Sequence, residues 1–255
     1  MDNVIRVGQQ AANAKKIFDA FVNLSKLENE KDFRASFHLR PTVDGVTIVS
    51  TLKIAPMRGK EVKIDKLDMN LQKIVEVLKA PNDNKMLEIM DDLGFKQRQS
   101  EGRREEDVQA ALIRELVLNK KNYNDMLFVA SEFVLFEYEE KANQEKRPDV
   151  LAFKDGILYD IELKNERTLE VVTQASGYVD HIKNHLSTFN DCLCNFPNCQ
   201  VGDIKDVKGI IIVPYSKSPK GLLEKDSKER GLELWTFNDD GNGELVFNQG
   251  KDAAL

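Results

Sequence analysis

The sequence predicts an α/β protein, α+β overall, with a mixed central sheet flanked by helices. In the second half of the chain, segments whose apolar residues recur at helical spacing alternate with short segments typical of strands. The segment 209–214 reads GIIIVP, a continuous β-branched run that is typical of a central strand covered on both faces. The pair Asp155-Gly156 lies between two apolar runs, which is a strong hairpin signal.

The chain divides near residue 100, because the polar segment 95–104 around Gly102 is the best linker candidate. We therefore expect an N-terminal α+β domain over residues 1–100 and a second domain over residues 101–255. The first part is predicted to hold a helix at 9–27, strands at 33–40 and 46–54, and helices at 68–80 and 84–93. The second is predicted to hold a helix at 105–118, a strand at 127–137, the hairpin, a helix at 168–185, a strand at 208–214, a short helix at 219–229, a strand at 232–237 and an edge strand at 245–247.

The first N-terminal strand is predicted to have one apolar and one basic face. Its apolar positions are Phe33, Ala35, Phe37 and Leu39, and they alternate with Arg34, Ser36, His38 and Arg40. The second strand is expected to pair with the first, and its Thr47, Thr51 and Lys53 extend the polar face. Arg58, Lys60 and Lys63 follow near the next turn. This face is either an ordinary solvated surface or one that contacts phosphates and positions DNA without reading its sequence.

Charge is distributed unevenly along the chain. The net charge is −6, yet residues 1–98 contain 17 Lys and Arg against 14 Asp and Glu, whereas the remainder contains 20 against 29. The first part is therefore the better candidate for a surface that binds a nucleic-acid backbone, and the balance argues against broad non-specific coating of DNA.

The hairpin carries the main candidate site. A two-residue turn at Asp155-Gly156 places Asp149 directly opposite Glu162, with Cβ atoms about 4.5–5.5 Å apart. Two like charges so placed are destabilising unless a positive charge lies between them, and a divalent cation would supply it. Along the second strand Asp160, Glu162 and Lys164 point to one side because strand side chains alternate.

This arrangement has a metal-site interpretation and a simpler alternative. Asp149, Glu162 and the main-chain carbonyl of Leu163 are hard oxygen ligands that suit Mg²⁺ or Mn²⁺, and the Lys164 ammonium could orient or help deprotonate a water. The alternative is an alternating strand with a solvated charged face. Apolar residues on both faces of the hairpin favour burial, in which carboxylates are rarely tolerated without a partner.

Pro148-Asp149 followed by Glu162-Leu163-Lys164 resembles the signature of the PD-(D/E)XK nuclease superfamily. Gln174 and Tyr178, four residues apart on the next helix, resemble the Gln-x-x-x-Tyr element of its RecB-type and archaeal mismatch-endonuclease branches, although an amphipathic helix could carry this pair by chance. The resemblance covers about residues 105–213 and implies a restriction-endonuclease-like fold.

The resemblance also implies roles for individual residues. Asp149, Glu162 and Leu163 would bind Mg²⁺, with Mn²⁺ as a substitute, Lys164 would position water or stabilise the transition state, and Gln174 and Tyr178 would lie near the metal and the DNA backbone. An upstream helix would add an acidic residue, for which Glu105 and Glu106 both qualify, because Val108, Leu112 and Leu116 follow at helical spacing. A carboxylate in a first helical turn is also common because it complements the helix dipole.

The resulting expectation is a metal-dependent DNA nuclease, with an endonuclease favoured, acting in restriction, phage defence or repair. DNA is the expected partner, and cleavage of both strands of a duplex would favour a homodimer. The alternatives are a catalytically inactive nuclease-fold module that binds nucleic acid or protein, and an enzyme acting on RNA.

The remaining features of the sequence narrow its class. No apolar run approaches the roughly 18 residues of a membrane span, and the N-terminus lacks the apolar core of a signal peptide, so a cytoplasmic location is expected. Cys192, Cys194 and Cys199 do not follow the spacing of structural zinc sites, even with His181 and His185 nearby, and we expect reduced thiols in a helix-to-strand connection.

Overall fold

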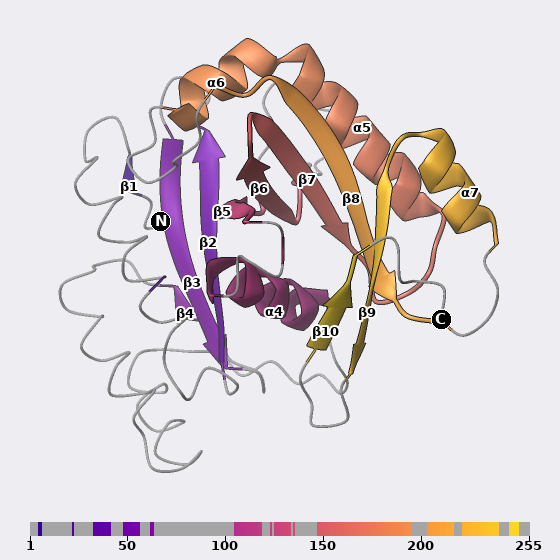
Figure 1. Cartoon of the computed structure of the whole chain (residues 1–255). Coiled ribbons are helices and arrows are strands. Elements are labelled where there is room, and N and C mark those ends of the chain that lie inside the picture. The colour runs from indigo at the N-terminus through magenta and orange to yellow at the C-terminus, as the bar shows by residue number, and fades with distance from the viewer. Residues whose placement is uncertain are drawn as a thin grey trace, which may run out of the picture.

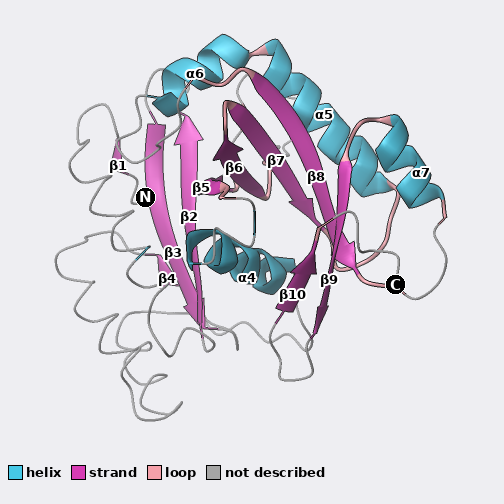
Figure 2. Cartoon of the chain, in the orientation of Figure 1, coloured by secondary structure: helices cyan, strands magenta, loops and turns pink. Residues whose placement is uncertain are grey.

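The chain has an α/β fold built on a mixed sheet (Figures 1 and 2). The computed structural model describes residues 5–6, 22, 33–41, 48–56, 62–63, 105–118, 123, 125–133, 135, 147–194, 203–216, 221–239 and 245–249. The strands are β1 (Ile5–Arg6), β2 (Phe33–Pro41), β3 (Ile48–Pro56), β4 (Val62–Lys63), β5 (Leu127–Ser131), β6 (Val150–Lys154), β7 (Ile157–Leu163), β8 (Asp206–Pro214), β9 (Glu233–Asp239) and β10 (Leu245–Asn248). The helices with described bounds are α4 (Glu105–Leu118), α5 (Glu170–Asn184), α6 (Leu186–Cys194) and α7 (Leu222–Glu229).

The sheet has the strand order β1-β3-β2-β5-β6-β7-β8-β9-β10, with β4 paired to β3. The pairs β2–β5, β7–β8 and β8–β9 are parallel and the others are antiparallel. The sheet curls around α4, which contacts both β2 and β10, while α5, α6 and α7 follow its outer side (Figure 1). Among the described helices, none is both long and apolar enough to cross a bilayer.

The central hairpin has the predicted register. Val150 pairs with Ile161 and Lys154 with Ile157, so the turn contains only Asp155 and Gly156. Their φ angles are 51° and 81°, and a type I′ turn needs positive φ at both central positions. Every residue from Leu158 to Leu163 is buried, so the charged residues of β7 do not form a solvated face.

Strand β8 confirms the prediction of a central strand. The side chains of Ile210, Ile211, Ile212 and Val213 have no exposed surface, and β8 lies between β7 and β9 in the sheet. Parallel neighbours on both edges and helices over the sheet explain why this segment is apolar without alternation.

Helix α4 begins and ends where predicted, and α5 lies within two residues of the predicted range. Strand β5 ends at Ser131 and is therefore shorter than predicted. It ends there because Glu132 adopts a φ of 46°, which breaks the extended backbone. Helix α6 was not predicted, although its apolar positions Leu186, Phe189 and Leu193 have helical spacing.

Of the N-terminal part, the structure describes the strands and one helical residue, Val22, which packs against the core. The predicted pairing of the first two strands is confirmed, with His38 opposite Thr51 and Ser36 opposite Lys53. Pairing of His38 with Ser131 joins β2 to β5, so the sheet continues across the predicted boundary near residue 100. The division into two domains stays a prediction. Several predicted features lie outside the described residues. They are Thr47, Arg58, Lys60, the rest of the helix at 9–27, the helices at 68–80 and 84–93, and the linker at 95–104.

The cysteine cluster differs from its prediction. Cys192 and Cys194 belong to α6 rather than to a loop, and Cys199 lies outside the described residues. The rings of His181 and His185 are stacked at 4.3 Å, and Nδ1 of His185 donates to the main-chain oxygen of His181 at 2.8 Å. This contact occupies one ring nitrogen of His185 at the C-terminal end of α5.

Gly209 lies where a side chain of α5, Val179, packs tightly on the sheet. A Cβ atom at this position would lie 3.0 Å from Cγ2 of Val179 and would overlap Cδ2 of Leu232. We expect Gly209→Val to lower the free energy of unfolding by about 1–3 kcal/mol, because the surrounding core would be overpacked. Urea denaturation measures the change, and Gly221→Ala is the control because nothing lies within 4 Å of its Cβ position. An equal loss in both variants would contradict the packing argument.

Candidate active site

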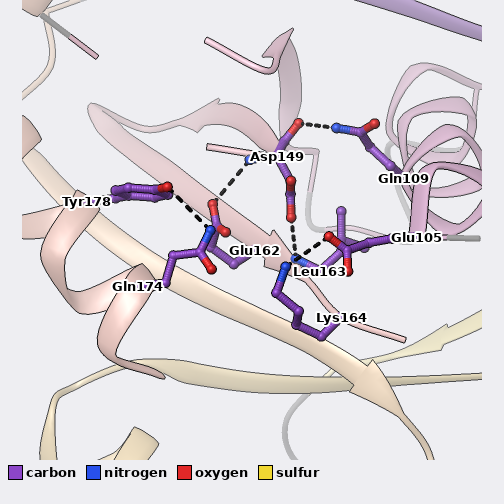
Figure 3. A network of polar contacts seen from close by, with 8 residues as sticks. All are labelled: Glu105, Gln109, Asp149, Glu162, Leu163, Lys164, Gln174 and Tyr178. Atoms are coloured by element: carbon purple, nitrogen blue, oxygen red, sulfur yellow. Dashed lines mark hydrogen bonds and ion pairs between the residues drawn. The ribbon is translucent and has the colours of Figure 1, made fainter. Parts of the chain in front are cut away.

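Asp149 and Glu162 hold each other in place through two reciprocal hydrogen bonds (Figure 3). The Asp149 N–H donates to Oε1 of Glu162 at 3.1 Å, and the Leu163 N–H donates to Oδ2 of Asp149 at 2.8 Å. The two residues therefore lie next to each other, as the hairpin register predicted. Each carboxylate is oriented by the main chain of the opposite strand.

Glu162 and its neighbour Asp160 have carboxylate oxygens without a hydrogen-bond partner. Glu162 and Asp160 have no exposed surface. Oε2 of Glu162 and both carboxylate oxygens of Asp160 are buried without a hydrogen-bond partner. Buried polar atoms are normally paired, and an unpaired one indicates a missing ion or water. A cation bound beside these Glu162 and Asp160 oxygens would supply the partner that they lack.

Burial also changes the acidity of the cluster. It raises the pKa of Asp149 to about 7, although the Leu163 hydrogen bond and the charge of Lys164 act in the opposite direction. Burial, followed by the charges of Asp149 and Asp160, raises the pKa of Glu162 well above its ordinary value. These shifts are those expected when acidic groups share an interior site without a cation.

Lys164 lies at the end of β7 beside the two carboxylates. Its Nζ donates to Oε1 of Glu105 at 2.9 Å, and its main-chain N–H donates to the Ile212 carbonyl at 3.0 Å. Burial alone would lower the pKa of Lys164, but the Glu105 hydrogen bond and the charges of Asp149 and Glu162 raise it. The ammonium therefore stays protonated and is held within the site.

Helix α4 reaches the site with two side chains one turn apart. Glu105 contacts Lys164, and Nε2 of Gln109 donates to the Asp149 carbonyl at 2.6 Å. Val108, Leu112 and Leu116 anchor the helix because they are buried, as their spacing predicted. Of the two acidic residues considered from the sequence, Glu105 is the one whose described side chain touches Lys164.

Gln174 and Tyr178 lie on α5, close to Glu162 (Figure 3). The Gln174 Nε2 donates to the Tyr178 hydroxyl at 3.3 Å. Burial, and then the charge of Glu162, raises the pKa of the Tyr178 phenol, which keeps it neutral. Gln174 and Tyr178 thus lie near the carboxylates, and the two residues are joined by their own hydrogen bond from Gln174 to Tyr178.

Comparison with protein-family models, curated proteins and solved structures gave no match. Any function proposed for this chain therefore rests on the site residues described above.

Two residues of the site were not assigned to it from the sequence. The alternation of β7 predicts Asp160 on the same side as Glu162, but its complete burial and its unpaired oxygens depend on α5 packing over that face. Gln109 could have been found, because it lies four residues after Glu105 and therefore on the same face of the predicted helix.

The residues can accommodate a divalent cation. Mg²⁺ is usually bound by one or two carboxylates and retains several waters, so Asp149 and Glu162 are a sufficient pair. The N–H and C=O of one strand residue point to the same edge, and because the Leu163 N–H points at Asp149, its carbonyl faces the same side. Among the described residues, no three His, Cys, Asp or Glu side chains converge on one point. A cation here would therefore depend on the carboxylate pair, a main-chain oxygen and water.

Proposed function

We propose that this chain is a metal-dependent nuclease with a restriction-endonuclease-like fold, related to the PD-(D/E)XK superfamily. The observation that supports it best is the mutual orientation of Asp149 and Glu162 at buried positions, with an unpaired Glu162 oxygen and the Lys164 ammonium alongside. An exposed charged strand would not need this arrangement.

Each residue has a role in phosphodiester hydrolysis under this proposal. Asp149, Glu162 and the Leu163 carbonyl would hold Mg²⁺, or Mn²⁺ in its place. The protonated Lys164 would orient the attacking water and offset the charge that develops on the phosphoryl oxygens. Glu105 would keep Lys164 charged and directed into the site. Gln174 and Tyr178 would lie beside the bound backbone, where the neutral phenol can donate a hydrogen bond.

The metal would supply Lewis-acid stabilisation of the charge that develops on the phosphoryl and leaving oxygens. The protein contributes a preorganised position for it, because both carboxylates are already fixed by main-chain hydrogen bonds. Such preorganisation is the main way in which a protein stabilises a transition state.

DNA is the proposed substrate, and the N-terminal strands are the proposed surface for its backbone. The register of β2 and β3 places Arg34, Ser36, His38 and Arg40 opposite Ala55, Lys53, Thr51 and Val49. These positions contribute three Lys and Arg residues, Arg34, Arg40 and Lys53, and no acidic residue, so the row suits contact with phosphates.

A cleavage assay tests the proposal. Purified protein would be incubated with labelled single-stranded, duplex and branched DNA and with RNA of the same sequence, in Mg²⁺, Mn²⁺ or EDTA. We expect cutting that requires the metal and is lost in Glu162→Ala. A preference for RNA would change the substrate class without changing the site.

The contrary outcome is equally defined. If neither protein cuts any substrate but both bind DNA, the chain is a catalytically inactive nuclease-fold module. If Glu162→Ala cuts as fast as the wild type, activity in the preparation comes from elsewhere and the site assignment is wrong.

A further inference from the structure

The main-chain carbonyl of Asp149 is held from two sides. It accepts hydrogen bonds from Nε2 of Gln109 at 2.6 Å and from the Glu132 N–H at 3.1 Å. Asp149 precedes the first residue of β6, and β5 ends one residue before Glu132. The regular ladder of the sheet therefore stops at this point, and a side chain from another element completes the hydrogen bonding of Asp149.

The orientation of this residue determines two further contacts. The Asp149 N–H donates to Glu162, and the Asp149 side chain accepts from Leu163. Rotation of the main chain around Asp149 would weaken both contacts together. A group that fixes the Asp149 carbonyl therefore also fixes the two carboxylates relative to each other.

Gln109 has the properties of such a group. Its side chain is buried, with 6% of the residue exposed, and a buried amide is costly unless it is hydrogen-bonded. It lies one helical turn after Glu105, which contacts Lys164. One face of α4 thus reaches both the carboxylate pair and the lysine (Figure 3).

We infer that Gln109 is a positioning residue, which acts through the main chain of Asp149 to preset the carboxylate pair for a cation. The inference rests on the proposed function for its catalytic meaning. Its structural part concerns the Asp149–Glu162–Leu163 contacts and can be measured without metal or substrate.

The simplest alternative is that the Gln109 bond only ties α4 to the sheet. Asn190 provides a matched control for that role. Its side-chain amide donates to the Ile204 carbonyl at 3.0 Å and accepts from the Ile204 N–H at 2.7 Å, so it also joins a helix to a distant main-chain segment. Both of these Asn190 bonds go to Ile204, which is not among the site residues described above.

The experiment compares Gln109→Met and Gln109→Glu with Asn190→Leu. Methionine keeps the length of the side chain and loses the donor, whereas glutamate keeps the shape and replaces the donor with an acceptor. Amide hydrogen exchange in EDTA would be followed at Asp149 and Leu163. We expect faster exchange at these two amides in both Gln109 variants and wild-type exchange there in Asn190→Leu, even if all three lower the Tm.

Mn²⁺ titration by calorimetry and single-substrate kinetics provide the functional readout. Loss of a group that orients a metal ligand typically weakens metal affinity or activity by about 10–100-fold. We expect Mn²⁺ affinity to fall about tenfold in Gln109→Met and kcat to fall with little change in KM. Asn190→Leu should retain both values.

The results separate the inference from the proposed function. Wild-type exchange at Asp149 and Leu163 in the Gln109 variants, with Mn²⁺ affinity within about twofold, would overturn the positioning role. If the wild type neither binds Mn²⁺ nor cuts nucleic acid, the proposed function fails. Faster exchange confined to the Gln109 variants would then still support the positioning of Asp149.

Discussion

Replacing Lys164 with alanine is expected to lower the rate of cleavage by about 10²–10³-fold, the usual effect of removing a positioned donor from a reaction centre. The ammonium is fixed by Glu105 at 2.9 Å and lies beside Asp149 and Glu162. Under the proposed mechanism its loss removes a positive group that would face the developing charge. Substrate affinity should change much less, because one side chain contributes little to binding an extended polyanion.

Single-turnover cleavage and fluorescence anisotropy with labelled DNA would measure the two quantities. Lys183→Ala is the matched control, because Lys183 forms an ion pair with Asp206 in which both side chains are about half exposed. A Lys164→Ala protein that cuts at the wild-type rate would remove this residue from the mechanism.

Replacing Asp149 with asparagine is expected to stabilise the metal-free protein at pH 8 by up to about 4 kcal/mol. The folded protein raises the pKa of this group from 3.8 to about 7. Between these values the folded state holds a proton that the unfolded chain has lost. Stability of the wild type therefore falls as the pH rises from about 4 to about 7, and the penalty is complete above pH 7.

Asparagine avoids the penalty and can still accept the Leu163 hydrogen bond. Urea denaturation in EDTA between pH 5 and pH 8 would measure the two slopes, with Asp180→Asn on the exposed side of α5 as a control. Adding Mg²⁺ at pH 8 should raise the Tm of the wild type and not that of Asp149→Asn, because only a ligand that binds the folded state stabilises it. An unchanged pH slope in Asp149→Asn would show that its carboxyl group is not the source of the instability.

Much of the site could be predicted from local sequence patterns. The Asp155-Gly156 turn determines the register of its hairpin, and this register brings Asp149 to Glu162 without reference to the rest of the chain. The buried stripe of α4 followed from the spacing of Val108, Leu112 and Leu116. Both predictions needed only neighbouring residues.

The remaining features depend on packing between distant elements. The end of β5 at Ser131 results from the positive φ of Glu132, a residue type that gives no local signal for it. The isolation of Asp160 depends on the packing of α5 over β7. Joining of β2 to β5 through His38 and Ser131 is likewise a long-range contact, which neither strand predicts alone.

The two contacts of α4 have a consequence for the order in which the candidate site is assembled. Gln109 and Asp149 are 40 residues apart, and Glu105 and Lys164 are 59 apart. Contacts across such distances close large loops and form late in comparison with a hairpin. The hairpin can therefore form early while its acidic pair is still unsupported by α4. A partly folded or newly synthesised chain would lack these contacts of α4, so the proposed cutting activity would be expected only with the complete tertiary structure.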